Sequence, residues 1–76
     1  MTIEEMESDL IKKFGFEETE HTCCFVLHNE SRTVKLWIDD KITIYLNQAK
    51  VFQLNCDEYG FNRAERYMAD LLRVAA

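Results

Sequence analysis

The sequence predicts an α+β fold, a two-layer sandwich in which two helices cover one face of an antiparallel β-meander. Near both ends of the chain, apolar residues recur every three to four positions, the spacing of a helix with one buried face. Between these segments, apolar and polar residues alternate with the period of two that is typical of half-buried strands. The expected element order is α-β-β-β-(β)-α, in which the fourth strand is short.

The first helix is expected over residues 3–14. Thr2 and Glu5 have the S/T-x-x-E spacing of a capping box, and Gly15 stands where a left-handed residue commonly ends a helix. The apolar face of this helix consists of Ile3, Met6, Leu10, Ile11 and Phe14.

Three strands are expected in the segments "HTCCFVLH", "RTVKLWID" and "KITIYLN". Residues that pair across an antiparallel ladder face the same side, so parity fixes the register. The predicted pairs are Ile38 with Ile42, Leu36 with Ile44, Val34 with Leu46, Leu27 with Val34, and Phe25 with Leu36. The predicted core face is Cys23, Phe25, Leu27, Val34, Leu36, Ile38, Ile42, Ile44 and Leu46.

A fourth strand, "VFQL" at 51–54, is expected after a turn at 48–50, and it would add Phe52 and Leu54 to the core face. The second helix follows from the spacing of Phe61, Ala64, Met68, Leu71 and Ala75. Its start has two alternatives. Asp57 caps it with Gly60 in the first turn, or Asn62 caps it with Glu65 three residues later.

Length and composition predict one folded domain over residues 1–76. Of the 76 residues, 47% are hydrophobic and 30% charged, which is ordinary for a globular protein, and the chain has no proline and two glycines. The sequence shows no signal peptide and no apolar run of the roughly 18 residues that a membrane span needs. Three cysteines, an odd number without framework spacing, indicate free thiols. We therefore expect a cytoplasmic protein.

The sheet face opposite the core carries the first candidate contact surface. Parity places Cys24, Val26, His28, Lys35, Trp37, Thr43 and Tyr45 there, with Trp37 paired to Thr43 and Cys24. Aromatic side chains with polar tips are enriched at binding hot spots. The predicted protein-contact residues are Val26, Lys35, Trp37 and Tyr45. In the alternative interpretation, the aromatic pair only stabilises the sheet, or another part of the chain covers this face.

The second candidate surface is acidic. The net charge is -5, and residues 1–20 carry all of it, with seven acids against two lysines. Such a surface would meet a basic partner and speed association, as in small phage-type inhibitors such as anti-CRISPR proteins. In the alternative, these acids offset the helix dipole and keep the protein soluble. The predicted electrostatic contacts are Glu4, Glu5, Glu7, Glu17, Glu18 and Glu20.

No cofactor or metal site is expected, and the protein is not predicted to be an enzyme. Cys23 and His28 have opposite parity, so they do not form a zinc-ligand pair on one strand face. Cys56 precedes the second helix, but Asp57 and Glu58 beside it oppose a thiolate. A thiol-based sensor or small enzyme is therefore the third hypothesis.

Nucleic-acid binding is the second hypothesis. The order α-β-β-β-α is similar to that of double-stranded RNA-binding domains, and Arg63, Arg66 and Arg73 lie on the second helix. The similarity is one of topology alone, because "CDEYGF" stands where such a domain has a lysine cluster. Nucleic acid is thus not the expected partner. The leading hypothesis is a small acidic, non-enzymatic domain that binds another protein or itself, as an inhibitor, an adaptor or a homodimer.

Overall fold

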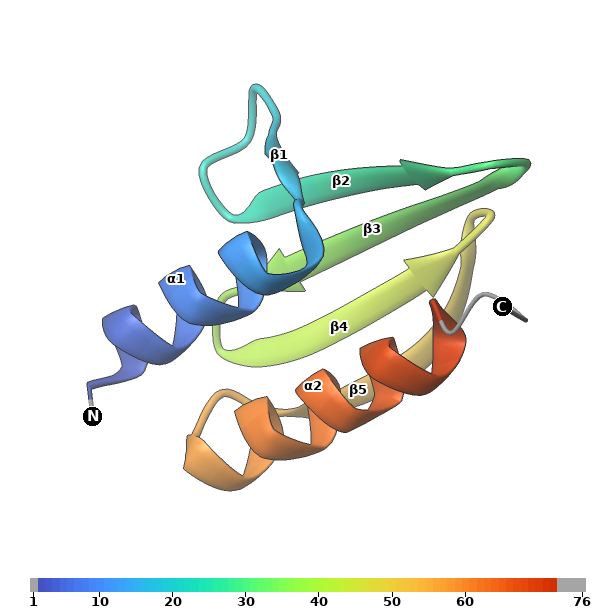
Figure 1. The fold of residues 1–76 in the computed structure, drawn as a ribbon. Helices are drawn as coiled ribbons and strands as arrows, with labels where there is room; N and C mark the ends of the chain where they lie inside the picture. Colours follow the sequence, from blue (N-terminus) through green and yellow to red (C-terminus); the bar gives the residue numbers. More distant parts are fainter. Residues whose placement is uncertain (1, 73–76) are drawn as a thin grey trace.

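The computed structural model describes residues 2–72, and within them it has the predicted α+β architecture. Both helices lie side by side on one face of a five-stranded antiparallel sheet (Figure 1). The strands follow one another in the sheet in chain order. The elements are α1 (Ile3–Phe14), β1 (Glu17–Glu18), β2 (Cys24–Asn29), β3 (Arg32–Ile38), β4 (Lys41–Leu46), β5 (Ala49–Asn55) and α2 (Glu58–Leu71).

The first helix has the predicted bounds and the predicted caps. The Thr2 hydroxyl accepts from the Glu5 amide at 3.2 Å, and the Glu5 carboxylate accepts from the Thr2 amide at 3.1 Å, which completes the capping box. At the other end, Gly15 has a left-handed φ of 78° and donates to the Ile11 carbonyl. Local sequence alone therefore determines both ends of α1.

The predicted register of the central strands is confirmed. Each of the five predicted pairs is present, from Phe25 with Leu36 to Val34 with Leu46. Leu36, Ile42 and Ile44 are completely buried between the sheet and the helices. From the helices, Leu10, Phe61, Ala64 and Met68 complete this core.

The sheet is wider than predicted. The short strand β1 was not predicted, and its Glu17 and Glu18 pair with Val26 and Phe25 of β2. At the other side, β5 begins at Ala49 rather than at residue 51. A register shift between Ile44 and Tyr45 makes Val51 an extra residue on β5. Beyond this bulge, Phe52 and Leu54 pair with core-facing residues as predicted.

The second helix begins by the first of the two alternatives. The Asp57 carboxylate accepts from the Gly60 amide at 2.7 Å, so Asp57 is the N-cap. At the C-terminal end, Arg32 of β3 donates to the Leu71 carbonyl at 2.8 Å. The predicted Ala75 lies outside the described residues.

Several residues differ from the predicted core, among them Ile3, which was placed on the apolar face of the first helix but is 40% exposed. Cys23 was placed in the core face but precedes β2 and is only half-buried. Phe16 was not predicted, and it is buried because β1 brings it back over the sheet. Within residues 2–72, no helix combines the length and the apolar character that crossing a membrane requires.

Candidate protein-contact surface

The outer face of the sheet, opposite the helices, brings all four predicted apolar contact residues together. Antiparallel pairing aligns Val26, Lys35 and Tyr45 in one row across β2, β3 and β4. Trp37 lies in the next row, a diagonal neighbour of Tyr45. Residues far apart in sequence thus form one continuous surface, which we call the outer face.

Two further residues extend the first row to both edges of the sheet. Glu17 of β1 pairs with Val26, and Lys50 of β5 pairs with Tyr45. The row therefore runs from an acid at one edge to a lysine at the other, with exposed Lys35 at its centre. Glu17 was predicted to belong to the acidic surface, because the strand that carries this residue was not predicted.

The second row of the outer face, formed by Cys24, Trp37 and Thr43, is more buried than predicted. Cys24 and Thr43 flank Trp37 and were expected to face water, but they are 3% and 6% exposed. Trp37 itself is half-buried, and the ring of His21 lies against its indole with centroids 5.5 Å apart. The cause is the unpredicted turn between β1 and β2, which brings His21 onto this face. Thr43 is satisfied, since its hydroxyl accepts from the Gln53 amide at 3.1 Å.

Beside Trp37 the outer face is hollowed. A shallow depression of about 440 Å³ lies between Trp37, Thr43, Tyr45 and Gln53, with Asp39 and Lys41 at its end. Its walls combine aromatic surface with polar side chains, which is the composition of protein contact sites rather than of a closed small-molecule pocket.

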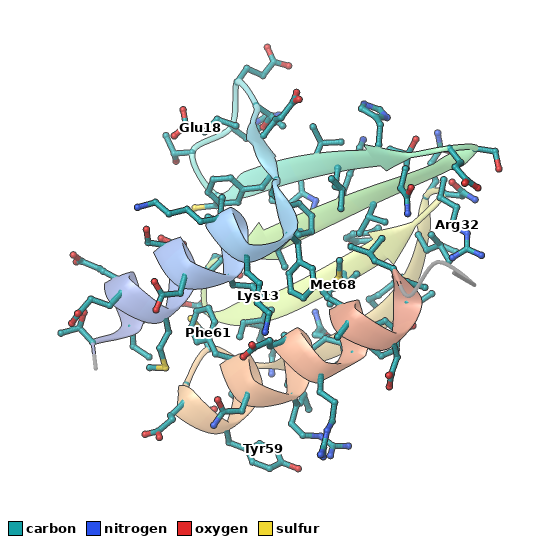
Figure 2. All side chains as sticks on the ribbon, viewed as in Figure 1. Lys13, Glu18, Arg32, Tyr59, Phe61 and Met68 are labelled. Atoms are coloured by element: carbon teal, nitrogen blue, oxygen red, sulfur yellow. The ribbon has the colours of Figure 1, made fainter. Side chains whose placement is uncertain are left out.

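The six predicted acids do not form one surface. Glu4 and Glu5 are exposed at the start of α1, whereas Glu17, Glu18 and Glu20 lie beyond its far end. A helix of 12 residues separates the two groups, a length of roughly 18 Å. In Figure 2, Glu18 points away from the helices into solvent.

Glu7 is the exception among these acids. It was predicted as a contact residue of the acidic surface, but it is half-buried. Its position explains this, because it follows Ile3 by four residues and precedes Leu10 by three, on the apolar side of the helix. Burial first, and the neighbouring Glu4 second, raise the pKa of the Glu7 carboxyl above its ordinary value.

Cys56 lies in surroundings that disfavour a thiolate. Burial raises the pKa of its thiol, and the charges of Glu7, Asp57, Asp39 and Asp40 raise it further. A reactive cysteine needs the opposite, a positive or dipolar environment that stabilises the anion. Among residues 2–72, no three His, Cys, Asp or Glu side chains are arranged to hold a metal ion.

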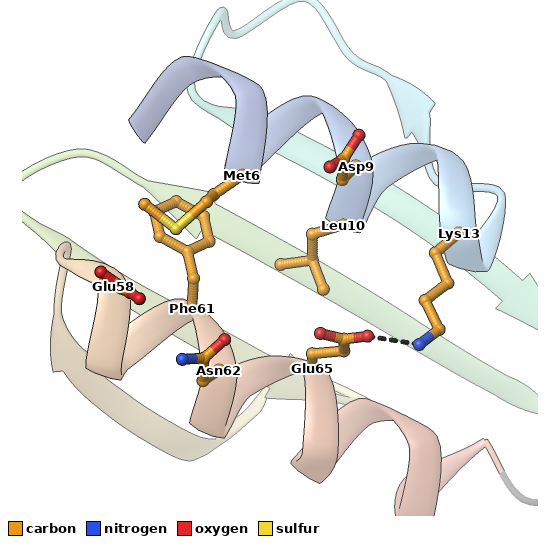
Figure 3. A pocket seen from close by; sticks show the side chains of 8 residues that line it. All are labelled: Met6, Asp9, Leu10, Lys13, Glu58, Phe61, Asn62 and Glu65. Carbon is orange, nitrogen blue, oxygen red and sulfur yellow. Dashed lines mark hydrogen bonds and ion pairs between the residues drawn. The ribbon is translucent and has the colours of Figure 1, made fainter. Parts of the chain in front are cut away.

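The helices enclose a second depression, of about 210 Å³, on the opposite side of the molecule. Met6, Leu10 and Phe61 form its apolar floor, while Asp9 and Glu58 stand at its rim (Figure 3). Lys13 of α1 and Glu65 of α2 form an ion pair across one end. We call this the interhelical groove. The interhelical groove was not predicted from the sequence, because it depends on how two separate helices pack.

The predicted nucleic-acid residues are only partly described. Arg63 and Arg66 are exposed on α2, and Arg73 lies outside the described residues. With five strands between the helices, the element order also differs from the α-β-β-β-α of double-stranded RNA-binding domains. In comparisons with protein-family models, curated proteins and solved structures, nothing matches this chain.

Proposed function

We propose that this chain is a small non-enzymatic protein-binding domain, and that its contact surface is the outer face of the sheet. The observation that carries the proposal is the pair of half-buried aromatics, Trp37 and Tyr45, on a sheet face that neither helix covers. Aromatic residues that keep a polar atom accessible are the most frequent anchors of protein interfaces.

The charges on this face favour a protein over a nucleic acid. Lys35, Lys41 and Lys50 are exposed there, but Asp39 and Asp40 line the same hollow. Phosphate binding depends on a dense basic footprint, and the chain as a whole carries a charge of -5. A partner with mixed charges and an apolar centre fits this surface better.

The two edges of the sheet are poorly suited to pair with a strand of another protein, which supports the outer face as the contact surface. One edge strand, β1, has only two residues, and the other, β5, carries a bulge at Val51 and the charge of Lys50. Short, bulged and lysine-bearing edges are the features by which proteins discourage strand addition. Free thiols at Cys23, Cys24 and Cys56 are in keeping with a role in a reducing compartment such as the cytoplasm.

Self-association is the second candidate, and the first row of the outer face favours it. If two copies met face to face about a twofold axis at Lys35, Glu17 of one copy would stand opposite Lys50 of the other, and Val26 opposite Tyr45. In this arrangement Lys35 of one copy would stand opposite Lys35 of the other, and the two positive charges would repel each other. Replacing Lys35 by serine should therefore strengthen a homodimer but leave or weaken binding to another protein.

Site-specific photocrosslinking tests the proposal. A photoreactive residue at position 35 reports on the outer face, and the same residue at the exposed Lys12 of α1 is the matched control. We expect one discrete crosslinked protein from position 35 and none from position 12, and we expect the Tyr45→Glu substitution to remove it. Crosslinks that form equally from both positions, or that survive Tyr45→Glu in a folded variant, would contradict the proposal.

A further inference from the structure

We propose that the interhelical groove is a second docking site, which receives one arginine side chain from a protein partner. The groove lies on the helical side of the molecule, away from the outer face. It is therefore independent of the proposed function above, and either site can fail its test without the other.

The interhelical groove is of a size to hold one amino-acid side chain rather than a whole small-molecule ligand. Its volume is about 210 Å³, below the roughly 300 to 1,000 Å³ typical of pockets for drug-sized ligands. Its floor is apolar, built from Met6, Leu10 and Phe61. A slender guest with an aliphatic stem is the kind that fits.

The charged groups at the rim of the groove are mostly negative, so they favour a positively charged guest. Three carboxylates, those of Asp9, Glu58 and Glu65, line the groove together with one ammonium group, that of Lys13. Lys13 pairs with Glu65, so Asp9 and Glu58 have no ion-pair partner among residues 2–72. Figure 3 shows that these two acids come from different helices, Asp9 from α1 and Glu58 from the start of α2.

Ordinary helix stabilisation does not account for Asp9. An acid helps a helix dipole within the first turn, and Asp9 is six residues past the start of α1. Lys13 stands four residues after Asp9, the spacing of an intrahelical ion pair, yet it bonds to Glu65 on the other helix. The carboxylate of Asp9 is thus left at the rim of the groove.

Arginine suits this arrangement better than lysine. Both side chains lay an aliphatic stem along apolar surface while the charged head stays in water. The guanidinium group is less strongly hydrated, and its planar fork bonds two acceptors at once. The groove offers oxygen acceptors of this kind from both helices: the carboxylates of Asp9 and Glu58 and the side-chain carbonyl of Asn62 all line it.

A peptide titration followed by amide chemical shifts tests the site on the intact protein. The probe is acetyl-Ala-Arg-Ala-amide, and the control is the same peptide with citrulline, which has nearly the same shape without the charge. For a probe of this size we expect saturable shifts around Leu10 and Asn62 with a Kd of about 1 mM. Citrulline should bind at least about fivefold more weakly. Equal binding of both peptides, shifts that do not saturate, or shifts on the outer face would overturn the proposal.

Two sets of variants separate the groove from general charge attraction. Asp9→Asn with Glu58→Gln should weaken arginine binding about fivefold to tenfold. Asp70→Asn with Glu20→Gln removes the same charge elsewhere and should change it less than about twofold. An equal effect of both pairs would overturn the proposal. Asn62→Phe on the exposed side of α2 should fill the groove and abolish binding in a folded protein; binding that persists there would place the arginine elsewhere.

The same variants identify a different occupant. If the protein alone showed a concentration-dependent mass increase that Asn62→Phe abolished, a second copy would fill the groove, with one of its own arginines. That result would overturn the assignment to a different protein. A monomer at all concentrations, together with saturable arginine binding, supports the assignment.

Discussion

The carbonyl oxygen of Asn55 lies 1.9 Å from the position that a β-carbon on Gly60 would occupy. Asn55 is the last residue of β5, and Gly60 is in the first turn of α2, so the chain reverses within a few residues. The backbone of the strand end passes directly against the helix. Glycine is required here for the close approach of two backbones, rather than for an unusual backbone conformation.

Replacing Gly60 by alanine should therefore destabilise the protein by about 2 to 3 kcal/mol, because the clashing atom belongs to the backbone and cannot rotate away. Urea denaturation followed by circular dichroism measures the change. Asn62→Ala, at an exposed site two residues later on the same helix, is the control and should shift the unfolding free energy by less than about 0.5 kcal/mol. A fully stable Gly60→Ala variant would show that α2 can start differently.

The Gly60 contact shows why the start of α2 could not be decided from sequence. Asp57 and Asn62 are both good N-cap residues, and the choice depends on where β5 delivers the chain. By contrast, α1 and the β2–β3–β4 register were predictable, because a capping box and strict alternation are local patterns. The bulge at Val51 has no such pattern, and it arises only once β5 pairs with β4.

The candidate surface was predictable to a similar extent. Parity placed Trp37, Lys35 and Tyr45 on one face, and the structure confirms that placement. The covering of Trp37 by His21 was not predictable, because it depends on β1, a strand of two residues whose sequence is two glutamates. Glutamate is depleted in strands, so tertiary pairing overrides propensity there.

The turn between β4 and β5 carries a removable strain. Asn47 and Gln48 both have positive φ, 49° and 74°. Asparagine tolerates this conformation, whereas glutamine does not, so Gln48→Gly should stabilise the protein by about 0.5 to 1 kcal/mol. Thermal unfolding measures the gain.

Asn47→Gly is the matched control for this turn. Asn47 accepts a hydrogen bond from the Thr33 amide at 2.9 Å, and losing that bond costs about 1 kcal/mol. We therefore expect Asn47→Gly to be neutral or destabilising. If both glycine variants stabilised the protein equally, the side chain of Asn47 would contribute nothing to the turn.

Glu7 should make stability fall as its carboxyl ionises. Burial raises the pKa of Glu7 above the ordinary value of 4.5, so the folded state binds the proton more tightly than the unfolded state. The folded state is thus favoured by this group below pH 4.5, and the advantage is lost as pH rises through the folded pKa. Glu7→Gln should stabilise the protein at pH 7 and lose that gain below pH 4.5.

Unfolding free energies at pH 4 and pH 7 measure this difference. Glu20→Gln, which removes one charge at an exposed site, is the control variant. A gain from Glu7→Gln that is the same at both pH values would mean that its cause is packing rather than ionisation.

Cys56 should react slowly with alkylating reagents at neutral pH. Burial and then the charge of Glu7 raise the pKa of its thiol above 9.0, so little thiolate is present at pH 7. Iodoacetamide labelling followed by peptide mass mapping measures its rate against pH, and the midpoint should lie above pH 9. Glu7→Gln should accelerate labelling of Cys56 in the folded protein. Fast labelling at pH 7 would instead favour the thiol-sensor hypothesis.

The covering of Trp37 by His21 predicts a specific spectroscopic change on the outer face. Trp37 is the only tryptophan, so its emission reports this site alone. His21→Ala removes the ring that lies 5.5 Å from the indole, and the emission should shift to the red while acrylamide quenches it more strongly. His28→Ala is the control, because His28 lies on the same face but contacts Thr33. Equal effects of the two variants would show that His21 does not shield the indole, and the second row would then be open to a partner along its whole length.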